Sequence, residues 1–365
     1  MIESITVFRL AVPLTKPYRL AFGAVERYDT LIVEMTDRDG RRGLGEATVL
    51  TGYTDETIDD CWRVASDIAQ KLAGRDLQAA RSLLLALAAT HPFTATAFGT
   101  AVEMIEGSSF FAITQNTPVP LVGLLDAKDE AGLHAEADRL LAEGYRTFKL
   151  KVGFNAAADI EKVRMAQRAV RGRAALRIDA NQGYTAEQGV AFVRALDPAG
   201  IELFEQPCPA GDWESHLAVA KAASVPLMLD ESIYGMADIE KAATLKCATY
   251  IKLKLMKLVT LDGLARALER IRELGMKPVL GNGVAADLGC WLESLVAARH
   301  IDNAGEQNGF LKAKTPLLAE PLTFADGALQ LKAGYVPQLD PDHIARYRID
   351  TLTCTARGAI KGRAA

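Results

Sequence analysis

The chain has 365 residues, of which 49% are hydrophobic and 24% charged, a composition typical of a globular protein. Its 42 Lys and Arg residues are outnumbered by 46 Asp and Glu residues. Without a basic excess, the chain lacks the electrostatic signature of a nucleic-acid-binding protein, so we expect no nucleic-acid partner. The five cysteines include no CxxC pair, which argues against a cysteine zinc cluster or a disulfide framework.

Two uncharged windows have the length of a membrane span, but neither has its composition. Residues 82–102 contain His91 and Pro92 near their middle, and residues 107–125 contain two prolines and several polar residues. We therefore expect no membrane partner. No basic segment precedes the first apolar stretch, which Arg9 interrupts, so we expect a cytoplasmic protein without a signal peptide.

Residues 1–118 predict an α+β unit. Apolar and polar residues alternate in 5–10 and 30–35, and Asp37–Gly40 reads as a turn, a pattern typical of antiparallel strands. From residue 55 to residue 106 the apolar residues return at three- and four-residue spacing, which predicts helices. A sheet followed by helices indicates a separate α+β domain.

Residues 119–315 predict a parallel barrel. Short apolar runs recur here, each followed by a turn and an amphipathic segment of helix length, which indicates a parallel sheet buried on both faces. Seven units are clear and an eighth, near Ala304, is weak, so we expect a (β/α)8 barrel. Residues 316–365 predict a segment that returns to the first unit and ends in a frayed tail. The seven runs are Leu121–Leu125, Thr147–Lys151, Ala175–Asp179, Ile201–Glu205, Pro226–Asp230, Tyr250–Lys254 and Pro278–Gly281.

Ionisable residues stand at the end of five consecutive runs. A single acid after a strand is more often the N-cap of the next helix. Three acids in successive units favour a functional site instead, because the predicted helices start several residues later. Since the carboxyl ends of barrel strands meet at one mouth, we expect these side chains to lie close together. They are Lys149, Lys151, Asp179, Glu205, Asp230 and Lys254.

The three acids predict a magnesium site. Carboxylate oxygens are hard ligands that suit Mg²⁺, which keeps positions free for water or substrate. A zinc site would require imidazole or thiolate ligands, but none of the five histidines ends a predicted strand or forms an HExxH motif. We therefore expect Mg²⁺ as the cofactor.

The lysines predict proton transfer. They could serve only as counter-ions of the acids, but a lysine near a divalent cation and shielded from solvent can also act as a base. The second and sixth strands lie four apart in an eight-stranded barrel, so Lys151 and Lys254 would face each other. A metal-held carboxylate between two lysines indicates abstraction of an α-proton, with Mg²⁺ stabilising the enediolate. The expected partner is a small-molecule carboxylate substrate.

At these residues the chain resembles the enolase superfamily, specifically its muconate-lactonizing-enzyme-like branch. The segment Gly43–Ala47 is similar to the capping domain of that family, so the resemblance covers nearly the whole chain. The other matching stretches are Lys149-Leu-Lys151, Asp179–Gly183, Glu205-Gln-Pro207, Asp230-Glu-Ser232 and Lys254–Lys257.

The resemblance implies a role for each residue. Residues 1–118 would form a capping domain, whose loops at Phe22–Gly23 and Thr51–Tyr53 close the barrel mouth. The implied metal ligands are Asp179, Glu205 and Asp230, the acid/base pair is Lys151 and Lys254, the cation near the substrate carboxylate is Lys149, and the residues supporting them are Asn181, Glu231 and Lys252.

Departures from the family narrow the substrate. Relatives commonly carry Asn where this chain has Lys252, and dipeptide epimerases hold the substrate ammonium with an Asp-x-Asp pair where it has Glu306–Asn308. No histidine ends the seventh run, which disfavours the racemases that use a His–Asp base. The pattern is most similar to cis-3-hydroxy-L-proline dehydratases, so we expect β-elimination of hydroxyl, with 2-epimerisation as a possible second outcome. The residues expected at the substrate are Lys149, Tyr53, Asn282 and Glu306.

Three other functions remain open. An epimerase or racemase of a dipeptide or N-acylamino acid needs the same lysines and no leaving group. Gly281–Ala286 fits GxGxxA with Asp302 downstream, as in NAD-dependent oxidoreductases, but it lies late in a βα series without a convincing strand before the acid. The third is a non-catalytic metal-binding scaffold, in which burying two lysines beside a cation would bring no structural benefit. Because barrels of this kind often assemble, we also expect a homo-oligomer.

Overall fold

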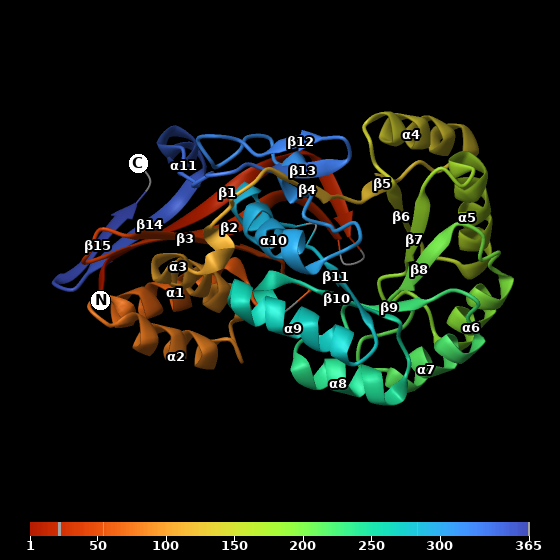
Figure 1. The fold of residues 1–365 in the computed structure, drawn as a ribbon, viewed down its shortest axis with the longest axis horizontal. Helices are drawn as coiled ribbons and strands as arrows, with labels where there is room; N and C mark the ends of the chain where they lie inside the picture. Colours follow the sequence, from red (N-terminus) through yellow and green to blue (C-terminus); the bar gives the residue numbers. More distant parts are fainter. Residues whose placement is uncertain (21–22, 54, 283, 364–365) are drawn as a thin grey trace.

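The computed structural model describes residues 1–20, 23–53, 55–282 and 284–363. A long antiparallel sheet with strand order β15-β14-β1-β2-β3 lies at one end of the molecule, and three helices pack beside it (Figure 1). These elements are β1 (Ile2–Leu20), β2 (Gly23–Asp37), β3 (Arg42–Val49), α1 (Ile58–Leu72), α2 (Leu77–Leu87), α3 (Pro92–Glu106), β14 (Arg348–Thr355) and β15 (Gly358–Arg363).

The sheet confirms the strands expected near the start of the chain. The two alternating segments pair directly, with Ile5 opposite Met35 and Leu10 opposite Thr30. The carboxylate of Asp37 closes the next turn by accepting hydrogen bonds from the amides of Asp39 and Arg41. The frayed tail expected at the C-terminus is wrong for residues 358–363, because β15 pairs in register with β14. Residues 358–363 show no alternation of apolar and polar residues, and pairing with β14 is what orders them.

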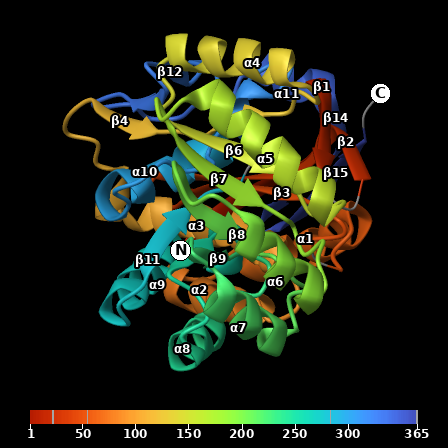
Figure 2. The same cartoon turned by 90° about the vertical axis from the view of Figure 1, so that its right-hand side faces the viewer.

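The second part of the chain forms a curled parallel sheet with helices on its outer face (Figure 2). The order β11-β10-β9-β8-β7-β6-β5 matches the seven expected runs. The strands are β5 (Gly123–Leu125), β6 (Thr147–Lys151), β7 (Ala175–Asp179), β8 (Ile201–Glu205), β9 (Leu227–Leu229), β10 (Tyr250–Leu253) and β11 (Lys277–Leu280). The helices are α4 (Glu130–Ala142), α5 (Ala156–Val170), α6 (Ala186–Ala195), α7 (Trp213–Ala222), α8 (Met236–Leu245), α9 (Leu261–Glu273) and α10 (Asp287–His300).

The weak eighth unit near Ala304 closes the ring. A parallel bridge joins Leu121, just before β5, to Gly305. On the other side, the Glu306 amide donates to the carbonyl of Leu280 at the end of β11, with a donor–acceptor distance of 3.1 Å. Residues 304–306 therefore occupy the place of the eighth strand, which confirms the barrel.

The remaining elements lie mostly between or beside these two parts. A small sheet with order β12-β13-β4 brings the start of the barrel against the returning C-terminal segment. The remaining elements are η1 (Ser109–Phe111), β4 (Thr117–Pro120), η2 (Leu255–Lys257), η3 (Gly309–Leu311), β12 (Thr323–Ala325), β13 (Ala328–Leu331) and α11 (Pro341–Tyr347).

No helix in the described residues is both long and apolar enough to cross a membrane.

Buried carboxylates join the capping sheet and helices to the barrel. Glu46, on β3, accepts hydrogen bonds from the amides of Ala286 and Gly289 at the start of α10. Glu103, on α3, accepts hydrogen bonds from the first two amides of α9. A helix N-terminus has unpaired amides and a partial positive charge, which favour a carboxylate. Burial nevertheless raises the pKa of both Glu46 and Glu103, and the helix amides offset only part of this rise. Within the capping domain, Gly45 allows β3 to pack closely against α3, because a Cβ at that position would lie 1.8 Å from the carbonyl oxygen of Ala97.

Candidate active site

Strand register brings the predicted residues to one edge of the barrel. Lys151, Asp179 and Glu205 are direct neighbours across β6, β7 and β8. Tyr250 pairs with Met228, so Lys252 and Asp230, each two residues further along, are level as well. Because side chains two residues apart on a strand point to the same face, this edge collects the charged groups.

The three acids are not helix caps. Asp179, Glu205 and Asp230 are all buried, with at most 2% of their surface exposed. The helices that follow them are capped by other residues, Thr185 for α6 and Asp212 for α7. The structure therefore excludes N-capping of the next helix, the alternative role that the sequence left open for these carboxylates.

A layer of buried ion pairs lies below the ends of the strands; we call Lys149, Lys252 and Glu306 the floor cluster. The Lys149 Nζ lies 2.7 Å from Glu306 Oε1 and within 2.8 Å of oxygens of Asp179 and Glu205. The Lys252 Nζ lies 2.7 Å from Glu306 Oε2 and 3.0 Å from Glu205 Oε1.

Charge pairing in the floor cluster outweighs desolvation. Burial alone would lower the pKa of a lysine, but the surrounding carboxylates raise the pKa of Lys149 and of Lys252. Burial alone would raise the pKa of Glu306, but the two ammonium groups hold it well below its usual value. These shifts favour the charged form of all three side chains at neutral pH.

The two lysines expected to transfer protons lie one layer nearer the mouth; we call Lys151 and Lys254 the rim pair. The Lys151 Nζ lies 2.6 Å from Asp179 Oδ2 and also donates to Asn181. The Lys254 Nζ lies 3.0 Å from Asp230 Oδ2. Lys151 ends β6 and Lys254 directly follows β10. These two strands are four positions apart in the ring, so the rim pair occupies opposite walls.

Both lysines of the rim pair line one cavity of about 50 Å³, which also receives residues of the capping domain. Asn282, expected to contact the substrate, lies there, and its Nδ2 is 3.5 Å from the sulfur of Met256. Gly283 lies outside the described residues. The lining residues are Tyr18, Leu50, Tyr53, Lys149, Lys151, Asp179, Asn181, Asp230, Glu231, Lys252, Lys254, Asn282, Val284 and Glu306.

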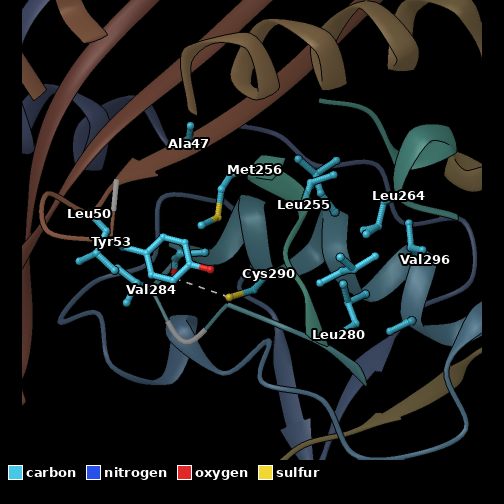
Figure 3. Close-up of a cluster of buried hydrophobic side chains, with 14 of the residues drawn as sticks. Ala47, Leu50, Tyr53, Leu255, Met256, Leu264, Leu280, Val284, Cys290 and Val296 are labelled. Carbon is cyan, nitrogen blue, oxygen red and sulfur yellow. Dashed lines mark hydrogen bonds between the residues drawn. The ribbon is translucent and has the colours of Figure 1, made fainter. Parts of the chain in front are cut away.

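Tyr53 connects the capping domain to the acids and lysines. Its hydroxyl donates to Asp230 Oδ1 at 3.1 Å, and the Lys254 Nζ lies 3.7 Å from the centre of its ring. Leu50 and Val284 lie beside the same ring (Figure 3). Of the other expected capping loop, Phe22 lies outside the described residues, whereas Tyr18, four residues earlier, lines the cavity. Nothing in the sequence singled out Tyr18 or Leu50.

Lys257 is a buried member of the site to which the sequence assigned no role. Its Nζ donates to the carbonyl of Asp230 at 3.0 Å and to that of Ile233 at 2.6 Å. Burial lowers the pKa of Lys257 to about 7, despite the nearby Asp230 carboxylate. Its place three residues after Lys254, across η2, is the signal that could have identified it.

Two of the expected supporting residues bond to each other. The Asn181 Nδ2 donates to Glu231 Oε1 at 2.9 Å, while the Asn181 amide donates to Asp179 Oδ1 at 2.8 Å. Burial, together with the negative charges of Asp230 and Asp179, raises the pKa of Glu231 to about 7. Lys252, the third, lies in the floor cluster.

The donor set of Asp179, Glu205 and Asp230 fits Mg²⁺ chemically, because it consists only of carboxylate oxygens. As the side chains stand, no group of three His, Cys, Asp or Glu residues in the described part of the chain is arranged to hold a metal. Instead, Asp179 and Glu205 share the ammonium of Lys149, and Glu205 and Asp230 share that of Lys252. The three carboxylates are thus linked in sequence around the barrel wall.

Relatives of known activity share this architecture. The L-Lys-D/L-Arg epimerase of Methylococcus capsulatus is 34% identical over 260 residues, which span 67% of this chain and 72% of that protein. The aromatic dipeptide epimerase of Herpetosiphon aurantiacus is 28% identical over 349 residues, or 90% of this chain and 94% of that protein. The crystal structure of the Cytophaga hutchinsonii dipeptide epimerase, complexed with Mg and the dipeptide D-Ala-L-Val, superposes with a TM-score of 0.87 at 20% identity, covering 97% of this chain and 100% of that one.

Family models match both parts of the chain. Residues 3–119 match the mandelate racemase/muconate lactonizing enzyme N-terminal domain, and residues 132–337 match the enolase C-terminal domain-like family. The chain therefore belongs to the mandelate racemase/muconate lactonizing enzyme family of the enolase superfamily, and it is an enzyme.

Proposed function

We propose that this enzyme is a Mg²⁺-dependent epimerase or racemase that inverts the α-carbon of an amino-acid derivative, either a dipeptide or an N-acylamino acid. The observation that carries the proposal is the rim pair, two lysines on opposite walls of one cavity, each held against a carboxylate. Inversion needs a proton to leave one face of the α-carbon and another to arrive on the opposite face, and this arrangement supplies a group for each.

The rim pair exchanges protons at its Nζ atoms. One Nζ, as the free amine, takes the α-proton, and the other, as the ammonium, returns a proton to the opposite face. Asp179 and Asp230 orient these amines. Asp179, Glu205 and Asp230 would hold Mg²⁺, which, when bound, stabilises negative charge on the substrate carboxylate. Lys149, fixed as an ammonium, adds positive charge close to the same carboxylate.

The floor cluster indicates whether the amino group of the substrate is free or acylated. Both Glu306 oxygens are bonded to ammonium groups of the protein, at 2.7 Å from Lys149 and from Lys252. A carboxylate already paired twice offers little to a substrate ammonium, which favours an N-acylamino acid over a dipeptide with a free terminus. The epimerase relatives favour the dipeptide. Both substrate classes therefore belong in the test.

The elimination expected from the sequence remains a prediction. A β-hydroxyl could leave after abstraction of the same α-proton, so the rim pair is compatible with cis-3-hydroxy-L-proline. The relatives reported above are epimerases, and they favour inversion without a leaving group. Dehydration of this substrate would restore that prediction.

The proposal is tested by proton exchange in D2O. The panel consists of L-Lys-L-Arg, L-Ala-L-Glu, N-succinyl-L-arginine and cis-3-hydroxy-L-proline, each incubated with enzyme and Mg²⁺ or with enzyme and EDTA. NMR measures deuterium at the α-carbon, and chiral chromatography measures inversion. We expect Mg²⁺-dependent exchange and inversion of a dipeptide or the N-acylamino acid. Absence of exchange throughout the panel, or exchange unaffected by EDTA, contradicts the proposal.

A further inference from the structure

Lys254 is followed at once by the short turn η2, and this turn is held from two sides. Lys254 itself is extended, at the junction between β10 and η2. From the capping domain, the Thr96 hydroxyl donates to the carbonyl of Met256 at 3.1 Å. From α10, the Glu293 carboxyl accepts a hydrogen bond from the amide of Leu255 at 3.0 Å. The backbone directly after Lys254 is therefore hydrogen-bonded to side chains of two helices, α3 and α10.

The side chains of η2 are packed into the hydrophobic core, so its backbone position depends on that packing and on these two hydrogen bonds. Leu255 and Met256 are buried in a cluster with Leu264 of α9 and Leu280 of β11 (Figure 3). Their side chains fix the turn against the barrel wall, whereas the Glu293 bond fixes its backbone. Because a backbone amide buried without a partner is costly, Glu293 is needed where it stands.

Glu293 is an unusual residue for the middle of a packed helix. It is only 2% exposed, and its Oε2 has no hydrogen-bond partner among the described residues. That oxygen belongs to a side chain lining a small cavity of about 20 Å³, which Glu46 and Asn282 also line. A buried carboxyl with one oxygen unpartnered has a stability cost, which favours a role outside the packing of α10.

We infer that Glu293 is a positioning residue for Lys254. From behind the barrel wall it holds the turn η2, and this turn determines the position of Lys254. The inference rests on the proposed function only in assigning Lys254 a proton-transfer step. Burial raises the pKa of Glu293 to about 8, and Glu46 adds to the rise while Lys254 opposes it. The side chain is therefore mostly neutral at pH 7, and glutamine can replace it without a change of charge.

The matched variants are Glu293→Gln, which keeps the oxygen that accepts the Leu255 amide, and Glu293→Met, which keeps the volume but removes the acceptor. Ser294→Ala is the control, because among the described residues the Ser294 hydroxyl bonds within its own helix, to the carbonyl of Cys290. Circular dichroism and thermal unfolding establish that all three variants fold.

The first measurement is deuterium exchange into each stereoisomer separately, using the panel compound that the wild-type enzyme exchanges fastest. Lys151→Ala and Lys254→Ala identify which stereoisomer depends on which lysine. We expect Glu293→Met to slow the Lys254-dependent exchange by about tenfold to hundredfold, because small displacements of a reacting group have effects of that size. Exchange that depends on Lys151 stays within about twofold, and Glu293→Gln and Ser294→Ala leave both directions within about twofold.

The second measurement needs no substrate. Amide hydrogen exchange of the peptide 253–260, followed by mass spectrometry, reports whether the Leu255 amide is protected. We expect protection to fall in Glu293→Met and to persist in Glu293→Gln. Equal slowing of both stereoisomers, no slowing, or unchanged protection in Glu293→Met overturns the inference. If the wild-type enzyme exchanges no compound of the panel, the proposed function fails, while hydrogen exchange still decides whether Glu293 holds the turn.

Discussion

The floor cluster and the rim pair contain the same kind of side chain one layer apart, yet their surroundings differ. Each lysine of the floor cluster contacts three carboxylates and is almost completely buried. Each lysine of the rim pair contacts one carboxylate, and a quarter of the Lys151 side chain is exposed. Three anionic partners hold each lysine of the floor cluster as an ammonium, whereas each lysine of the rim pair has one such partner and access to the cavity. Burial opposes the charge of Lys151, but the Asp179 carboxylate still raises the pKa of this lysine. The barrel thus separates lysines that are enclosed by carboxylates from the two lysines that we propose transfer protons.

The largest expected effect comes from breaking the rim pair. Lys151→Met and Lys254→Met each remove one proton-transfer group, so α-proton exchange falls by about 10² to 10⁴-fold. Each variant abolishes exchange on one face of the α-carbon and spares part of the other, which NMR in D2O resolves. Retention of exchange within about tenfold on both faces in either variant would remove that lysine from the mechanism.

Breaking the floor cluster should affect folding more than proton transfer. Lys252→Met leaves Glu306 and Glu205 with one cation fewer, and an uncompensated buried charge lowers the free energy of unfolding by about 3–5 kcal/mol. The double variant Lys252→Met/Glu306→Gln removes both charges and recovers much of this loss. Urea unfolding followed by circular dichroism measures both values, and equal stability of the single variant and the wild type contradicts the role given to the cluster.

A smaller effect is expected where the capping domain meets the rim pair. Tyr53→Phe removes the hydroxyl that bonds Asp230 but keeps the ring beside Lys254, so we expect kcat/KM to fall about tenfold, the range for a hydrogen bond to a charged group. Tyr234→Phe is the matched control, because among the described residues its hydroxyl donates to the carbonyl of Tyr53 and not to Asp230. An equal loss in both variants would assign the effect to the loop rather than to Asp230.

The last effect appears in the pH dependence of stability and concerns two acids behind the rim pair, Glu46 and Glu293. Burial raises the pKa of Glu46 to about 7 and that of Glu293 to about 8, so between pH 5 and 7 the folded chain binds more protons at these groups than the unfolded chain. Their contribution to stability is present at low pH and is lost as the pH rises. Replacing both by Gln should make the dependence of unfolding free energy on pH less negative over this interval, in urea titrations. Lys257, with its pKa lowered to about 7, acts mainly above the interval.

The barrel and its acids could be predicted because their signal is local. Each strand from β6 to β10 is a short apolar run, and the charged residue at its end is visible one unit at a time. Asp179, Glu205 and Asp230 needed only the rule that parallel strands end at one edge. Lys257 could have been found from its spacing after Lys254, but Tyr18 and Leu50 could not, because their place in the cavity depends on how the capping sheet packs against the barrel.

The sequence by itself determined the architecture, the acids and the rim pair, since strand periodicity and strand ends are properties of neighbouring residues. Only the tertiary structure decided which charges meet. Glu306 lies more than fifty residues from either of its lysine partners, and the pairing that keeps Lys149 and Lys252 charged exists only after the ring closes at Gly305. Glu293 likewise reaches the turn after Lys254 only because α10 packs there, and burial, not residue type, then sets its protonation.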